Sequence, residues 1–370
     1  MYLASTVDDA LYLLYEFLIA FLSVVFFGML MIDVAPYLKK TRENESHSRF
    51  NPKALVIVPC RGIDIGLEDN LRSIMGQGYG SYKAIAVVDS SSDPSVAHIR
   101  KVGMKFITSS VGKSGRASGK VRAIITALMT FRDYQAYVIA DSDIRVRSNW
   151  LSELIKPLGS SKIGISTTFP KFVPKAGFWS KVKFVWGFVG EGLMENKGTR
   201  FGWGGSLAFR KDLLNKNTMR LLRNSRYSVS DDISLTKAAK SMGLEIAYVR
   251  QAQPVVNSAD SFGQFAEWST RQSALTILGY SRNLYYGIAF YTAEILLFVS
   301  AFVMSYLITP LFLLFLVHFV KSEIKTARRA GKPDFTIALI VALMPFIYLS
   351  NLIAASGTSQ ITWRGRLYKI

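Results

Sequence analysis

Cysteine is almost missing from this sequence, because the 370 residues contain only one, Cys60. A single cysteine excludes an internal disulfide, and it also excludes a metal site built from cysteine thiolates. Cys60 ends an apolar run, so we interpret it as a small buried residue and not as a nucleophile. The sequence also has no internal repeat and no low-complexity tract.

Acidic residues are few beside basic ones, 26 against 45, which gives a net charge of +19. The basic excess flanks apolar segments, at Lys39, Lys40, Arg42, Lys321, Lys325, Arg328, Arg329 and Lys332. Cytosolic loops of membrane proteins carry such an excess, and anionic headgroups attract it. Since no nucleic-acid-binding motif accompanies these charges, we do not expect nucleic acid as a partner.

Charge is nearly absent from three long stretches, in a chain that is 50% apolar with a mean hydropathy of +0.23. Residues 11–32 carry only Glu16, residues 284–320 only Glu294 and His318, and residues 335–356 none. A membrane-spanning helix needs about 20 apolar residues. No small-residue cleavage site follows the first stretch, so we expect a retained helix there and not a signal peptide. The sequence therefore predicts an integral, multi-pass membrane protein.

These stretches divide the chain into four predicted parts. Residues 1–48 form a membrane anchor and basic linker, 49–260 a catalytic domain, 261–283 an interfacial helix, and 284–370 a membrane region with a basic tail. The segment before the first span holds Asp8 and Asp9 but no Lys or Arg. It should lie outside and the catalytic domain in the cytoplasm.

The two basic segments near the C-terminus make the membrane topology ambiguous. Residues 321–332 and the tail from Arg364 both favour the cytosol, but one span separates them. Either residues 335–356 turn back near Pro345, or one basic segment lies outside.

Apolar runs alternate with helical patterns in the middle of the chain. Strands are expected at residues 54–59, 83–88, 104–108 and 136–140, and helices at 66–75, 94–101 and 119–131. This alternation predicts an α/β domain with a mostly parallel sheet and helices on both faces. Ligands of such sheets bind beyond the carboxyl ends of the strands, where Asp89 and Asp141 stand.

The strongest local motif is Asp141-Ser142-Asp143, directly after a predicted buried strand. Two carboxylates at this spacing can face one Mg²⁺ or Mn²⁺ ion, which takes oxygen ligands and shares them with substrate phosphates. The alternative is that Asp143 caps the turn leading into a helix at residues 150–156.

Two further acidic pairs have similar alternatives. Asp89 and Asp93 can accept hydrogen bonds from a nucleoside, although Asp93 can instead cap the helix that follows Pro94. Asp231 and Asp232 precede a predicted helix at residues 233–242. One carboxylate can cap that helix, which leaves the other to act as a general base toward a hydroxyl.

Basic residues follow in a Gly/Ser-rich loop that opens a helix, at Lys113, Arg116, Lys120 and Arg122. We interpret them as a basic flap near a diphosphate, with a solvated surface loop as the alternative. On a later helix, Gln264, Trp268 and Arg271 share one face. That helix can bind a donor, lie at the membrane interface, or do both.

Residues 178–189 combine aromatic side chains with Lys181 and Lys183. Such a helix suits the membrane surface, and a core helix is the alternative.

The order VVD, ADSD, GGS, SDD and Q…W resembles family 2 glycosyltransferases with the GT-A fold, and within them the ceramide glucosyltransferase-like lipid glycosyltransferases. The tail Trp363-Arg364-Gly365-Arg366 resembles an ending common in that family. The resemblance covers about residues 55–368. It implies a nucleoside contact at Asp89 or Asp93, a metal on Asp141 and Asp143, a base at Asp232 and an acceptor site at Gly204, Gly205 and Ser206.

One position departs from the family's Gln/Arg-x-x-Arg-Trp motif. Glu267 stands where an arginine usually supports the diphosphate or the acceptor site, and Arg271 one turn later is the candidate substitute. With Lys120, Gln264 and Trp268, Arg271 completes the expected donor site.

The resulting hypothesis is an inverting transfer of a sugar from a nucleotide-sugar, such as a UDP-sugar, to a lipid hydroxyl. The expected partners are the nucleotide-sugar, the lipid acceptor and the membrane, and the cofactor is Mg²⁺ or Mn²⁺. A processive polysaccharide synthase and a polyprenyl-phosphate glycosyltransferase are alternative enzymes, and a membrane scaffold is the non-enzymatic alternative. The sugar, the nucleobase of the donor, the acceptor and the oligomeric state stay open.

Overall fold

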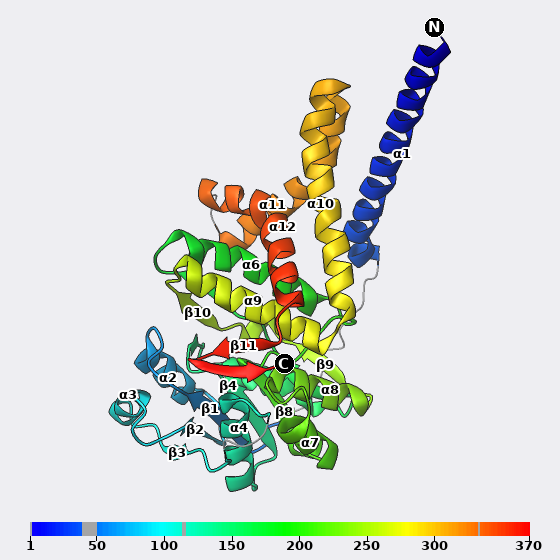
Figure 1. Ribbon diagram of the computed structural model, residues 1–370. Helices are drawn as coiled ribbons and strands as arrows, with labels where there is room; N and C mark the ends of the chain where they lie inside the picture. Colours follow the sequence, from blue (N-terminus) through cyan, green and yellow to red (C-terminus); the bar gives the residue numbers. More distant parts are fainter. Residues whose placement is uncertain (1, 39–49, 113–115, 332–333) are drawn as a thin grey trace. The chain divides into compact units, whose positions relative to one another are not determined.

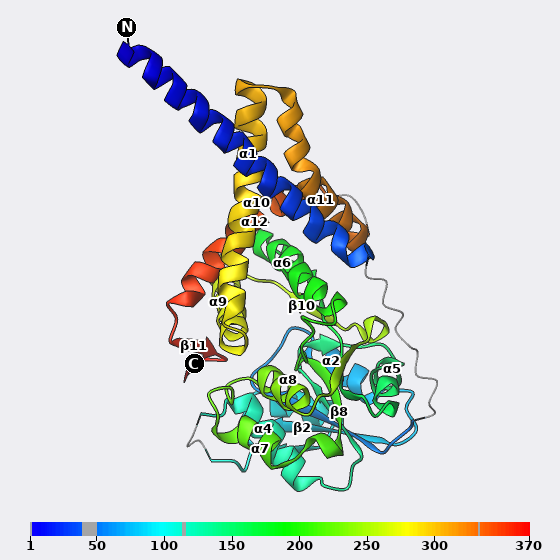
Figure 2. The ribbon, with the colours of Figure 1, turned by 90° about the vertical axis from the view of Figure 1, so that its right-hand side faces the viewer.

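The computed structural model describes residues 2–38, 50–112, 116–331 and 334–370 (Figures 1 and 2). It divides into two compact units. The sheet unit comprises Asn44–Ser281 and Ala354–Ile370, and the helical unit comprises Met1–Glu43 and Arg282–Ile353. The last 17 residues therefore group with the sheet, whereas the sequence had placed them with the membrane region.

A seven-stranded sheet in the order β3-β2-β1-β4-β8-β6-β9 forms the centre of the sheet unit. The strands are β1 (Ala54–Cys60), β2 (Tyr82–Val88), β3 (Phe106–Thr108), β4 (Ala136–Ala140), β6 (Ile163–Thr167), β8 (Ser206–Arg210) and β9 (Glu245–Tyr248). β1 pairs in parallel with β2 and β4, while β8 runs antiparallel to β4 and β6. The predicted parallel strands are confirmed, and they are mainly apolar, as expected of strands with both faces covered.

Helices cover both faces of this sheet. Leu207 and Phe209 of β8 join the core with α4 (Gly119–Thr130), α7 (Lys216–Asn224) and α8 (Asp231–Ser241). Successive strand residues point to opposite faces, so Ser206 points the other way. There its hydroxyl accepts a 2.8 Å hydrogen bond from the Trp150 indole of α5 (Trp150–Ile155). The remaining helices before β4 are α2 (Leu67–Met75) and α3 (Ser95–Lys101).

A second layer combines short strands that the sequence patterns did not reveal with two helices that they did. β5 (Ile144–Arg145), β10 (Val255–Ser258) and β7 (Lys171–Pro174) form a three-stranded sheet. The helices α6 (Phe178–Glu195) and α9 (Phe262–Gly279) contact each other, and α6 also contacts β7. The chain then returns as an antiparallel hairpin, β11 (Gln360–Trp363) and β12 (Arg366–Lys369). Short 3₁₀ turns complete the unit at Lys156–Gly159, Lys211–Leu213 and Arg250–Ala252.

The helical unit contains three helices that are long and apolar enough to span a membrane, within the part of the chain that is described. Their candidate spans are Tyr12–Ile32 in α1 (Tyr2–Leu38), Arg282–Leu307 (α10) and Phe335–Ser356 (α12). α12 continues without a break through Pro345, so this segment does not turn back there. The basic positions Lys39, Lys40, Arg42 and Lys332 lie outside the described residues.

The long apolar stretch 284–320 is not one helix. α10 ends at Leu307, and the Thr309 hydroxyl then accepts the Leu311 N–H at the start of a 3₁₀ segment, η4 (Pro310–Leu316). α11 (Val317–Ala330) follows and carries the basic residues. Within this unit the two isolated polar groups of the stretch meet, because Glu294 and His318 pair at 2.5 Å. That contact offsets the cost of burying Glu294.

Candidate functional site

Acidic residues that follow neighbouring parallel strands meet at the carboxyl edge of the sheet. Asp64 follows β1, Asp89 follows β2, and Asp141 follows β4. Ser142, between the two aspartates of the motif, donates a 2.6 Å hydrogen bond to Asp64. Asp143 does not cap the next helix, because Asn149 occupies the N-cap position of α5.

Lys120 connects the two acidic motifs that the sequence placed far apart. Its ammonium lies 2.8 Å from Asp141 Oδ1 and 3.4 Å from Asp231 Oδ2, and its side chain is 10% exposed. Ser118 caps α4 by accepting the Val121 N–H, which fixes Lys120 in the first turn. Burial alone would lower the pKa of Lys120, but the surrounding carboxylates raise it above its usual value, so the charge is retained.

Asp231 and Asp232 are both available to the site, because neither side chain caps α8. Ser230 caps the helix instead, accepting the Ile233 N–H, which corrects the expectation that one aspartate would do so. Gly204 donates its N–H to Asp232 Oδ1 at 3.0 Å. A Cβ at Gly204 would lie 2.0 Å from Asp231 and 2.2 Å from Asp232, so only glycine fits here.

Burial shapes the proton affinity of these carboxyl groups. It raises the pKa of Asp143 to about 7, with Asp141 and Asp64 adding to the effect. It also raises the pKa of Asp232 to about 8, assisted by the charge of Asp231, and raises the pKa of Asp231 itself. Low solvation combined with neighbouring like charges is typical of catalytic carboxylates.

The residues present fit a divalent cation that is shared with a ligand. Asp143 Oδ1 is buried and has no hydrogen-bond partner among the described residues. Those residues include no cluster of three or more His, Cys, Asp and Glu side chains suited to a metal. Asp141 and Asp143 would therefore supply two carboxylates, and phosphate and water oxygens the other ligands, as Mg²⁺ usually requires.

Residues 17–370 match the family described as Glycosyl transferase family 21. The chain belongs to this family. It is therefore a glycosyltransferase of the nucleotide-sugar, GT-A kind. The motif order resembled family 2, whereas the family that matches is family 21. The resemblance to the GT-A fold is confirmed.

One solved structure shares the fold at low identity, and a second is more distantly similar. A mannosyltransferase from Pyrobaculum calidifontis, in complex with GDP-Man and Mn²⁺, has a TM-score of 0.54 at 18% identity. That comparison covers 90% of this chain and 95% of the mannosyltransferase. Glucosyl-3-phosphoglycerate synthase from Mycobacterium tuberculosis, in complex with Mn²⁺, UDP and phosphoglyceric acid, has a TM-score of 0.43 at 16% identity. That comparison covers 62% of this chain and 78% of the synthase.

The two aspartates of the glycosyltransferase that are predicted to bind the nucleoside differ in their surroundings. Asp89 pairs with Arg366 at 2.8 Å and with Arg61 at 3.4 Å. One oxygen of Asp93 accepts the N–H of Ser95 at 2.9 Å and that of Gly62 at 3.0 Å. This geometry matches the capping alternative for Asp93 and leaves Asp89 as the stronger nucleoside candidate.

Other predicted contacts have structural partners. Gln264 forms a capping box with Ser261 at the start of α9 and is exposed. Trp268 lies edge-on to Trp186 and Phe172, inside an aromatic cluster. Together with Ser206, whose hydroxyl bonds to Trp150, these side chains hold the scaffold in the described structure. Their predicted contacts with substrate remain predictions.

The predicted basic flap separates into different roles. Lys120 enters the acidic site, whereas Arg122 is 6% exposed and donates to the Ala117 carbonyl within its own loop. Arg116 is exposed, and Lys113 lies outside the described residues.

Sequence reasoning missed several charged residues of the glycosyltransferase site. Lys183 of α6 is buried and donates a 3.1 Å hydrogen bond to Asp260. Burial is the main cause of the raised pKa of Asp143, and the charge of Lys183 partly counteracts it by lowering that pKa. Its helix was interpreted as membrane-facing, yet this lysine points into the protein. Asp64 and Arg61 were also missed. The hairpin arginines lay in a recognised ending, Trp363-Arg364-Gly365-Arg366, which was the available signal.

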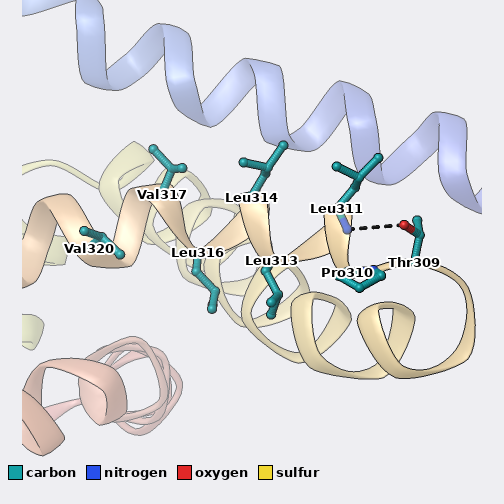
Figure 3. Close-up of a pocket in the computed structure, with 8 residues that line it drawn as sticks. All are labelled: Thr309, Pro310, Leu311, Leu313, Leu314, Leu316, Val317 and Val320. Carbon is teal, nitrogen blue, oxygen red and sulfur yellow. Dashed lines mark hydrogen bonds between the residues drawn. The ribbon is translucent and has the colours of Figure 1, made fainter.

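The helical unit contributes apolar surface and no acidic site of this kind among its described residues. Figure 3 shows a pocket of about 510 Å³ along η4 and the start of α11. A second pocket of about 410 Å³ is lined by α1 and α10, including Phe21, Val25 and Ile288. Both linings are almost entirely hydrocarbon, which suits lipid chains more than polar substrates.

Proposed function

We propose that this glycosyltransferase moves a sugar from a UDP-sugar to a hydroxyl group of a membrane lipid, with inversion at the anomeric carbon. One observation carries the proposal. Lys120 bridges Asp141 and Asp231, and thereby joins the Asp-x-Asp motif and the Ser-Asp-Asp motif in one site. Donor binding and proton removal can then occur side by side.

Asp141 and Asp143 would hold the divalent cation, which when bound supplies positive charge to the leaving diphosphate. The partnerless oxygen of Asp143 supports this assignment. The Pyrobaculum mannosyltransferase of similar fold was solved with GDP-Man and Mn²⁺, which also supports a metal and a nucleotide-sugar donor.

Asp232 is the proposed base. It is partly exposed, and the Gly204 N–H holds one of its oxygens in place. As the acceptor hydroxyl attacks the anomeric carbon, Asp232 takes its proton and the bond to the diphosphate oxygen breaks. Lys120 stays protonated and limits the repulsion among the surrounding carboxylates. A single displacement of this kind inverts the carbon and needs no covalent enzyme intermediate.

Three candidate spans and two apolar pockets support a lipid as the acceptor. The basic tail from Arg364 groups with the sheet unit and supports a cytoplasmic catalytic domain, because cytosolic segments carry such charges. Gly204 and Gly205 stay the proposed acceptor-side backbone, next to the base.

The test is a donor screen with purified full-length protein in lipid-containing detergent, with UDP-sugars and GDP-sugars supplied in turn with Mn²⁺. We expect nucleotide release with one class of donor, the UDP-sugars. Mass spectrometry should then detect a lipid that carries one added sugar. A long polymer would favour a polysaccharide synthase. The absence of release with every donor would contradict the proposal.

A further inference from the structure

The C-terminal hairpin β11–β12, drawn in red in Figure 1, contacts the acidic edge through Arg364 and Arg366. It is firmly anchored, because Ile361 is 4% exposed and packs with Val229, Ala274 and Ala355. At its other strand, the Tyr368 hydroxyl accepts the Gly119 N–H at the start of α4. A Cβ at Gly119 would lie 3.0 Å from the Arg366 guanidinium, which shows how closely the hairpin approaches that helix.

Two arginines of the hairpin reach opposite ends of the acidic edge. Arg366 pairs with Asp89 after β2, at the proposed nucleoside end. Arg364 pairs at 2.5 Å with Asp64, which in turn accepts the Ser142 hydroxyl inside the Asp-x-Asp motif. The hairpin therefore extends from the nucleoside end to the metal-binding end of the donor site.

The backbone at Arg364 is unusual for a side chain of this size. Arg364 has φ 52°, and Gly365 after it has φ 69°, which are the dihedrals of a two-residue turn with both central residues left-handed. Asn, Asp and Gly are preferred at such positions, because other residues are strained there by about 1 kcal/mol or more. Strained residues gather at functional sites, which points to a role for the guanidinium of Arg364.

Three other cations on this side of the sheet unit, among its described residues, are already engaged. Lys120 bridges Asp141 and Asp231, and Lys183 is bonded to Asp260. Arg271 donates to the Thr362 carbonyl and lies 5.8 Å from the Trp363 ring, so it holds the hairpin in place. Glu267, one turn before it, is 54% exposed and pairs with Arg271.

Arg364 is different because its side chain is 40% exposed and one of its nitrogens contacts Asp64. A guanidinium has five N–H donors in a fork that fits phosphate, so donors remain for a ligand. Resting on the proposed function, we infer that Arg364 binds the terminal phosphate of the nucleoside diphosphate, while Arg271 positions the hairpin that presents it.

The test compares nucleotides that differ by that phosphate. The variant is Arg364→Asn, since asparagine tolerates the left-handed turn, and the matched control is Lys369→Gln, which removes an exposed charge from the same hairpin. Binding of UDP, UMP, GDP and GMP is measured by titration calorimetry on the full chain in detergent with Mn²⁺. Thermal unfolding of each variant checks that it is folded.

We expect Arg364→Asn to weaken diphosphate binding at least tenfold and to change monophosphate binding less than twofold. Lys369→Gln should change neither. An equal loss of affinity for the diphosphate and for the matching monophosphate would overturn the inference, because the hairpin would then only shape the nucleoside pocket. Unchanged diphosphate binding would also overturn it. If the unaltered protein binds neither UDP nor GDP, the proposed donor itself is wrong, which is a distinguishable result.

Discussion

The two ends of the acidic edge use the same residue type in opposite environments. Asp89 is paired with two arginines, Arg61 and Arg366. Asp143 and Asp232, which are partly exposed like Asp89, face other carboxylates, and burial together with these like charges raises the pKa of both. A carboxylate paired with arginines is suited to binding, whereas one among other carboxylates is suited to holding a metal or moving a proton.

The largest expected effect tests the proton-transfer end. Asp232→Asn keeps the shape and an oxygen for the Gly204 N–H but cannot accept a proton. We expect kcat to fall about 10²–10⁴-fold, the usual contribution of a general base, with nucleotide affinity changed less than threefold. Steady-state kinetics and titration calorimetry measure the two. The control is Asp133→Asn, an exposed aspartate after α4, and a kcat near that of the control would remove the base assignment.

The next effect concerns the metal end. Asp143→Ala removes a carboxylate whose buried oxygen has no hydrogen-bond partner in the described structure. We expect Mn²⁺-dependent UDP or GDP affinity to fall about tenfold or more, since loss of a charged ligand costs at least ~1.4 kcal/mol. Binding measured with EDTA should change far less. Equal losses with and without metal would show that Asp143 acts on the nucleotide and not through a cation.

A related effect at the metal end is predicted with pH. The pKa of Asp143 is about 7, so this carboxyl is protonated below that pH and a metal must displace the proton. Apparent Mn²⁺ affinity should rise with pH by up to about tenfold per unit below pH 7 and level off above it. Mn²⁺ titrations between pH 5.5 and 8.5 measure this slope. A flat profile across that range would argue against a protonated Asp143.

The smallest effect is on stability. The pKa of Asp232 in the folded protein is about 8, above the value of 3.8 for a free aspartate, so the folded state binds its proton more tightly. This group's contribution to stability therefore falls as pH rises from about 4 through 8. Asp232→Asn should raise Tm by roughly 2–4 °C at pH 8.5, the shift that ~1 kcal/mol gives in a domain of this size, and by less at pH 6. A lower Tm at pH 8.5 would contradict the pKa shift.

The first half of the sheet could be predicted because its strands have a simple signature. β1, β2 and β4 are continuous apolar runs, and the acids after β2 and β4 come at the ends that parallel topology brings together. β8 runs antiparallel and begins directly after Gly204 and Gly205, of which Gly204 packs against the acids. The small sheet is formed of two- to four-residue strands, which leave too little pattern to detect.

The site was predicted residue by residue but not as a set of contacts. The acids could be named from motif order, yet the bridge by Lys120 depends on α4 and α8 meeting at one edge. Capping was misassigned to an aspartate because Ser230, one residue earlier, fits the same position. The hairpin arginines were seen only as a family ending. Their contacts with Asp64 and Asp89 join residues about 300 positions apart, which local patterns do not encode.

The position of the hairpin in the chain has a consequence for how the enzyme is made. Residues 360–369 are translated after all three candidate spans, yet they contact Asp64 and Asp89 of the acidic edge and Gly119 at the start of α4. The ribosome must therefore synthesise all three candidate spans before this edge receives its last strands. A fragment ending near residue 281 would contain the proposed catalytic aspartates but would lack the hairpin, so the donor site proposed here would be complete only in the longer chain.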